Sequence, residues 1–159
     1  MLAGFMGVGK STIAKELASR LGCTFVDLDD WITVHTGQSP AVHIRRDGEP
    51  SFRQLELNSL KTVISNPPLI IALGGGTIHI TGCKALLENT CVIILECRLD
   101  VVLERIKNSN RPLANHAKLL YQQRSRDYLQ FPNRIDVTEL QIDGVIEQIL
   151  MLWAQNEPS

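Results

Sequence analysis

The chain has 159 residues, of which 44% are hydrophobic and 21% are charged, the proportions of an ordinary globular protein. Its formal net charge of −1 excludes bulk electrostatic attraction to nucleic acid or to an anionic membrane. Apolar runs such as residues 69–73 are far too short to cross a bilayer, and no basic segment leads into a long apolar stretch at the start. We therefore expect one cytoplasmic, monomeric domain over residues 1–159, with no nucleic-acid or membrane partner.

The cysteines and histidines give no sign of a metal or redox centre. Neither set has the C-x-x-C or H-E-x-x-H spacing that metal ligands and redox cysteines favour. We interpret the thiols as free cysteines in a reducing compartment, and the imidazoles as solvent-facing or packing groups. These residues are Cys23, Cys83, Cys91 and Cys97, with His35, His43, His79 and His116.

The first element is a short strand, which we interpret as a trimmed or unusual N-terminus. It leads into residues 4–12, GFMGVGKST, which fit the phosphate-binding pattern G-x-x-x-x-G-K-[ST]. Glycines let successive backbone N–H groups point at phosphate oxygens, Lys10 can reach the β- and γ-phosphates, and Ser11 can ligate Mg²⁺. The pattern predicts a nucleotide site made of Gly7, Val8, Gly9, Lys10, Ser11 and Thr12.

A helix over residues 10–21 is predicted from apolar residues at every fourth position, with Gly22 as its stop. A buried strand follows over residues 24–28, and its carboxyl end carries Asp27, Asp29 and Asp30. Open α/β sheets bind ligands at this edge. In a strand, Asp27 and Asp29 would point to opposite sides, so that one could serve the metal and the other the acceptor. The alternative is a helix N-cap with a solvated acid beside it.

Further helices are predicted over residues 31–36, 40–47 and 50–65, the second of them opened by Ser39 and Pro40. Residues 69–73 then form a buried parallel strand. This strand runs directly into Gly74, Gly75 and Gly76. Backbone without side chains lets a ligand approach closely and leaves N–H donors free, so we favour a binding turn here over a plain one.

Strands over residues 91–95 and 135–137 alternate with helices over 81–89, 100–107, 116–129 and 143–153. This alternation indicates an α/β three-layer sandwich around a parallel sheet. Residues 108–115 form a polar loop, where Arg111 could act as a lid arginine that offsets charge on a transferring phosphoryl group. Arg53 and Arg124 could together grip a small acid, although a surface ion pair with Glu56 is the alternative for Arg53.

These motifs together resemble the shikimate kinases over essentially the whole chain. The resemblance rests on the phosphate loop, Asp27-Leu28-Asp29, residues 48–53 with Glu56, the three glycines, residues 111–113, and Arg124 with Tyr128. It implies the nucleoside monophosphate kinase fold with five parallel strands, a shikimate-binding region over about residues 29–60 and a lid over about 108–118. It also implies transfer of the ATP γ-phosphoryl group to the 3-hydroxyl of shikimate, a step of aromatic amino-acid (chorismate) biosynthesis.

The resemblance assigns roles on the nucleotide side as well. Ser11 would bind Mg²⁺ directly and Asp27 would bind it through water. Arg111 would close over the phosphates, and Arg105 would stack on adenine. The loop that normally touches adenine is not recognisable around residues 140–143.

On the acceptor side, the resemblance implies that Asp29 holds the shikimate hydroxyls and accepts the proton. Arg53, Arg124 and the N–H of Gly75 would hold the carboxylate. The chain departs from the family pattern at Pro40, His43 and Ile44, so one aromatic wall of the pocket is missing. Lys10, Asp29 and Arg111 form the expected catalytic set.

Two alternatives stay open. A gluconate-type kinase shares the phosphate loop but would need neither the three glycines nor the pair Arg53 and Arg124. A kinase-like module that binds nucleotide or shikimate without catalysis would be free to lose Lys10, Asp29 and Arg111. ADP release measured with each acceptor discriminates among the three.

Overall fold

The structure is a computed structural model that describes residues 1–66, 69–107 and 116–155. Within these ranges, five strands form one parallel sheet in the order β2-β3-β1-β4-β5. The predicted α/β class with a five-stranded parallel sheet is confirmed. The strands are β1 (Leu2–Gly4), β2 (Thr24–Asp27), β3 (Leu69–Ala72), β4 (Ile93–Glu96) and β5 (Arg134–Asp136).

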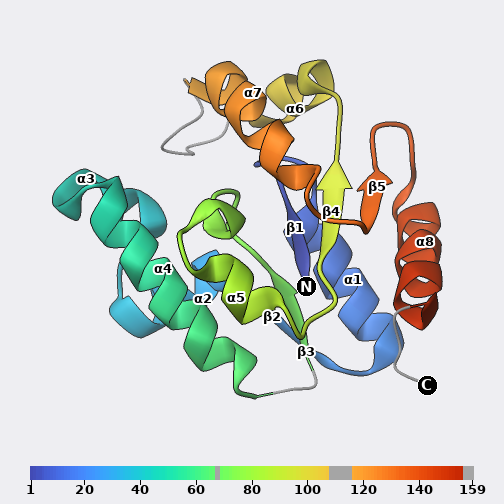
Figure 1. Cartoon of the computed structure of the whole chain (residues 1–159), viewed down its shortest axis with the longest axis horizontal. Coiled ribbons are helices and arrows are strands. Elements are labelled where there is room, and N and C mark those ends of the chain that lie inside the picture. Colours follow the sequence, from blue (N-terminus) through green and yellow to red (C-terminus); the bar gives the residue numbers. More distant parts are fainter. Residues whose placement is uncertain (67–68, 108–115, 156–159) are drawn as a thin grey trace.

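Helices cover the sheet as the outer layers of the sandwich. In Figure 1, α1 and α8 lie side by side on one side of the strands, with α4 and α5 on the other. Every helix of the described residues is too short or too polar to span a bilayer. The helices are α1 (Lys10–Leu21), α2 (Leu28–Thr36), α3 (Pro40–Asp47), α4 (Glu49–Ile64), the 3₁₀ turn η1 (Thr77–His79), α5 (Cys83–Leu87), α6 (Leu99–Ile106), α7 (Ala117–Tyr128) and α8 (Ile142–Gln155).

The short strand β1 is the middle strand of the sheet. Leu2 pairs with Ala72 of β3 and with Ile93 of β4, and Gly4 pairs with Leu95 of β4. Leu2, Ala72, Ile93 and Leu95 are all buried, as expected for parallel strands that are covered on both faces. Because two neighbouring strands hold β1, its three residues suffice to fix where the loop after Gly4 begins.

One predicted boundary is wrong in a way that matters for chemistry. Strand β2 ends at Asp27, and α2 already begins at Leu28, so Asp29 lies in the first turn of a helix and not at a strand end. The cause is local: the Asp27 carboxylate accepts the N–H groups of Asp29 at 2.9 Å and of Asp30 at 3.3 Å, an N-cap that starts the helix early. Asp27 and Asp29 therefore do not point to opposite sides of a strand, and Asp27 is the helix N-cap of the alternative interpretation.

The other boundaries agree within a few residues. Helix α1 has the predicted bounds, Pro40 stands at the start of α3 as predicted, and all four cysteines are free. Helix α6 begins at Leu99, one residue before the predicted start, so Asp100 lies in its first turn. Helix α5 is shorter than predicted, and β4 begins at Ile93 and not at Cys91.

Candidate active site

The phosphate loop joins the end of β1 to the start of α1. Gly7 and Gly9 have φ of +81° and +99°, a left-handed backbone that glycine adopts at no steric cost. Lys10 is buried, and its ammonium group donates to the carbonyl oxygens of Gly4 at 2.9 Å and Phe5 at 3.0 Å. The loop thus curls around a lysine at the N-terminal end of α1, where the N–H groups and the helix dipole favour phosphate.

Ser11 and Asp27, the two residues predicted to hold a metal, contact each other beside this loop. The Ser11 hydroxyl donates to Oδ2 of Asp27, while Oδ1 caps α2. Mg²⁺ in phosphoryl-transfer sites is held by one or two protein oxygens together with the substrate phosphates and water. A hydroxyl and a carboxylate that touch at the phosphate loop fit that donor set.

A cleft beside the loop is lined by several of the residues predicted to bind the nucleotide. Arg105, near the end of α6, faces the loop across this cleft, and Nη1 lies 3.7 Å from Sγ of Cys97. The apolar part of the lining includes Leu140, which precedes α8, and Ile142, which begins it; both are partly exposed. The family pattern was not recognisable in residues 140–143. The apolar side chains exposed there, beside the guanidinium group of Arg105, are the feature that sequence reasoning missed. The predicted residues that line the cleft are Gly7, Val8, Gly9, Thr12 and Arg105.

A second cleft lies beyond the carboxyl end of β3. Every described residue that we predicted to bind the acceptor lines it, although they come from four separate segments of the chain. The phosphate loop borders it through Met6. The predicted residues in its lining are Asp29, Arg53, Gly74, Gly75, Gly76 and Arg124.

Arg53 and Arg124 reach this cleft from two different helices, α4 and α7. Arg53 of α4 is held by Glu56, with Nη1 2.5 Å from Oε2, and Arg124 of α7 donates from Nη1 to the carbonyl oxygen of Gly75 at 3.0 Å. Burial opposes the charge of Arg53, but the carboxylates of Glu56 and Glu49 raise its pKa above the ordinary value. Burial lowers the pKa of Arg124, although an arginine keeps its charge at neutral pH. Two cations thus face the same small space.

The three glycines are required by close packing and not by backbone conformation, because their φ angles lie outside the left-handed region. A Cβ on Gly74 would overlap the Glu56 carboxylate and would lie 3.0 Å from Oδ1 of Asp29. A Cβ on Gly76 would lie 2.6 Å from Nη2 of Arg53. Glycine here lets the turn after β3 lie directly against the predicted acceptor-binding side chains.

Sequence reasoning missed several residues around this cleft. Thr77 donates to the fully buried carboxylate of Glu56, and Glu49 accepts from Arg53 at 2.7 Å. Ile44 lines the cleft, whereas His43 does not; Nε2 of His43 lies 2.9 Å from the Thr36 hydroxyl. Glu49 and Glu56 both belong to the stretch that carries the family resemblance, four residues before and three residues after Arg53, and this spacing is the sequence signal for their contacts with it.

The predicted lid arginine, Arg111, lies outside the described residues, as does most of the predicted lid at 108–118.

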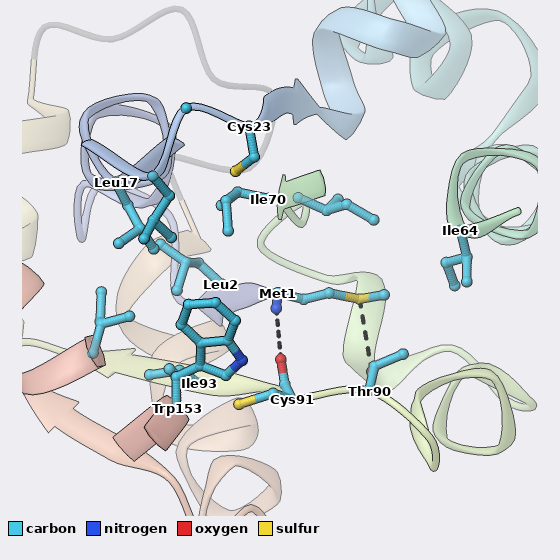
Figure 2. Close-up of a pocket in the computed structure, with 14 residues that line it drawn as sticks. Met1, Leu2, Leu17, Cys23, Ile64, Ile70, Thr90, Cys91, Ile93 and Trp153 are labelled. Carbon is cyan, nitrogen blue, oxygen red and sulfur yellow. Dashed lines mark hydrogen bonds between the residues drawn. The ribbon is translucent and has the colours of Figure 1, made fainter. Parts of the chain in front are cut away.

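A third cavity, of about 510 Å³, lies at the opposite, amino end of the strands. Figure 2 shows its largely apolar lining, which includes Leu17, Ile93 and Trp153, with the amino group of Met1 donating to the carbonyl oxygen of Cys91 at 2.6 Å. Burial lowers the pKa of that amino group. The cavity has no side chain suited to phosphoryl transfer, so the chemistry belongs to the other end of the sheet.

Comparison with known proteins agrees with the geometry. The family model for shikimate kinase matches residues 6–152. The chain belongs to the shikimate kinase family. The predicted family is confirmed, and with it the expected class of enzyme, an ATP-dependent phosphotransferase.

Other shikimate kinases resemble the chain over nearly its whole length. The shikimate kinase of Synechococcus elongatus is 36% identical and covers 99% of this chain and 91% of its own. The structure of shikimate kinase from Acinetobacter baumannii in complex with shikimate matches with a TM-score of 0.91 at 28% identity, over 99% of this chain and 93% of that one. A gluconokinase from Sinorhizobium meliloti matches with a TM-score of 0.70 at 13% identity, over 97% and 90% of the two chains, which shows a shared fold alone.

Proposed function

We propose that this chain transfers the γ-phosphoryl group of ATP to the 3-hydroxyl of shikimate, in the aromatic amino-acid pathway that leads to chorismate. The observation that carries the proposal is the convergence of two sites at one sheet edge. Asp29 and the glycine turn line the acceptor cleft, and Gly75 lies against the phosphate loop, where a Cβ would come 3.2 Å from the backbone nitrogen of Met6. An acceptor in this cleft would border the loop that holds the phosphates.

On the donor side, Gly7, Val8, Gly9 and Thr12 would surround the phosphates, and Lys10 would neutralise their charge. Ser11 and Asp27 would hold Mg²⁺, which when bound supplies further charge neutralisation. Arg105 would contact the adenine. Arg111, in a lid over residues 108–118, would close on the phosphates and exclude water.

On the acceptor side, Arg53 and Arg124 would bind the carboxylate of shikimate with help from the N–H of Gly75, within an acceptor-binding region over residues 29–60. Asp29 would orient the attacking hydroxyl and accept its proton as the new P–O bond forms. Phosphoryl transfer depends mainly on positioning and charge neutralisation. Asp29 and the two arginines would position the acceptor, and Lys10 together with Mg²⁺ would neutralise the charge of the phosphates.

The test is ADP release measured with shikimate, with gluconate and with no acceptor. We expect release that depends on shikimate and that Asp29→Asn nearly abolishes, while Asp143→Asn, a change of an exposed carboxylate on α8, leaves it at the wild-type level. Release with gluconate and not shikimate would assign a gluconate-type kinase. Shikimate or nucleotide binding without any release would assign a binding module.

We also infer that the enzyme works as a cytoplasmic monomer, with ATP and shikimate as its partners and neither nucleic acid nor membrane among them. Light scattering of the purified chain and fractionation of the host cells test this. A stable dimer or recovery with membranes would contradict it.

A further inference from the structure

Glu49 occupies the place between the two arginines that the acceptor carboxylate would need. It is the first residue of α4. Its Oε1 atom accepts from Nη2 of Arg53 at 2.7 Å and from Nε at 3.2 Å, and it lies 4.0 Å from Nη2 of Arg124. One carboxylate oxygen therefore contacts one guanidinium group and lies at ion-pair distance from the other.

Arg53 has a second carboxylate partner besides Glu49. Glu56 binds Nη1 of Arg53 at 2.5 Å, and the Glu56 side chain has no exposed surface. The Glu49 side chain, by contrast, keeps 42% of its surface exposed. The Glu49 side chain can move out into the solvent by rotating about its own bonds, whereas the Glu56 side chain is enclosed by protein.

The charges around the cleft favour such a movement when an anion arrives. Asp29, Glu49 and Glu56 give three carboxylates against the two guanidinium groups of Arg53 and Arg124, an excess of one negative charge. A further carboxylate would be repelled while Glu49 stays between the arginines. With Glu49 turned into water, the charges balance and the two guanidinium groups are open to an incoming acid.

We propose that Glu49 is an internal competitor for the acceptor's carboxylate, which must displace it from Arg53 and Arg124 in order to bind. This proposal rests on the proposed function, because it takes the two arginines as the acceptor's carboxylate site. The competition selects among ligands. A simple carboxylic acid must displace Glu49 without compensation, whereas an acceptor whose hydroxyl groups also reach Asp29 gains contacts that offset the displacement.

The experiment compares Glu49→Gln with wild type in steady-state ADP release. Gln keeps the size of the side chain and removes its charge. We expect the KM for shikimate to fall by about threefold or more, since a repelling charge is gone, while the KM for ATP stays unchanged. Glu16→Gln is the matched control, because Glu16 also pairs with an arginine four residues on, Arg20 at 3.0 Å, on the exposed face of α1; its KM for shikimate stays at the wild-type value.

The methyl ester of shikimate separates carboxylate competition from a general change in α4. The ester has the same hydroxyl groups but no negative charge that Glu49 could repel, so in Glu49→Gln its KM should fall by much less than the KM for shikimate. An equal fall for acid and ester would overturn the proposal. A KM for shikimate that rises in Glu49→Gln would also overturn it, because Glu49 would then support Arg53. An unchanged KM would overturn it as well, because Glu49 would then have no effect on binding of the acceptor.

Glu49→Ala provides a second variant if Gln disturbs the helix start, with thermal melting to confirm that each variant is folded. Glu49→Ala should also lower the KM for shikimate. Wild-type enzyme that releases no ADP with shikimate would instead refute the proposed function, so the two failures are distinguishable.

Discussion

Nη1 of Arg53 lies 2.5 Å from Oε2 of Glu56, a carboxylate with no exposed surface. The other oxygen of Glu56 accepts the hydroxyl of Thr77, just after the glycine turn. A buried carboxylate costs free energy unless its partners stay in place. This one joins α4, which carries a predicted acceptor-binding arginine, to the turn that follows β3.

Glu56→Ala should therefore destabilise the protein by about 3 kcal/mol, because it leaves the Arg53 guanidinium group partly buried without its main partner. Urea unfolding measures the loss. The exposed pair of Glu16 and Arg20 is the comparison, and Glu16→Ala should cost less than about 1 kcal/mol. Equal losses at the two sites would mean that Glu56 contributes no more than a surface ion pair.

Gly74→Ala should lower stability by about 1–3 kcal/mol and reduce turnover, because the added methyl group would overlap the Glu56 carboxylate and crowd Asp29. Gly144→Ala in α8 is the matched control. Its Cβ would lie 3.8 Å from Leu140, an ordinary contact, and replacing a helical glycine should stabilise the fold by about 0.4–1 kcal/mol. Thermal melting of both variants with ADP-release assays would decide; a neutral Gly74→Ala would show that the turn can shift.

Asp27→Asn should separate the structural role of this residue from its proposed metal role. Asn can still cap α2, so the free energy of unfolding should change by less than about 0.5 kcal/mol. The loss of charge beside Ser11 should raise the Mg²⁺ concentration needed for half-maximal activity. Asp27→Ala, which also loses the cap, should cost about 1 kcal/mol more. An unchanged Mg²⁺ requirement in Asp27→Asn would remove Asp27 from the proposed metal site.

His79 should make the fold sensitive to mild acid. Its Nδ1 atom lies 2.7 Å from Oδ2 of Asp127, whereas Nε2 is buried with no hydrogen-bond partner among the described residues. Burial lowers the pKa of His79, opposed by Asp127 and assisted by the nearby charges of Arg124 and Arg53.

Below pH of about 6.5, the ordinary pKa of histidine, the unfolded chain therefore binds a proton at His79 more readily than the folded protein does. Stability is retained above that pH and is lost as the pH falls towards 5. Melting temperatures of wild type and His79→Asn at pH 7.5 and pH 5 test this, since the variant keeps a donor near Asp127 but cannot take up the proton. If the melting temperature of wild type falls no more between pH 7.5 and pH 5 than that of His79→Asn, protonation of His79 does not account for the acid sensitivity.

Residue patterns alone predict the α/β class, the phosphate loop and most helix and strand positions, because these depend on periodicity and on motifs that span a few residues. Through the resemblance of its motifs to a family, the sequence also predicted several of the residues that line the two clefts, among them Arg53, Arg105 and Arg124. Helix and strand boundaries that depend on which group a side chain hydrogen-bonds could not be predicted from such patterns. The Asp27 carboxylate starts α2 early, so Asp29 stands on a helix and not on a strand.

The folded chain was needed to establish the strand order β2-β3-β1-β4-β5 and the reason for the three glycines. That reason is the approach of Glu56, Arg53 and the phosphate loop from distant parts of the chain. The folded chain was also needed to establish that Glu49 lies between two arginines that are far apart in sequence. Contacts of this kind follow from how helices pack on the sheet. No local pattern of residues specifies them.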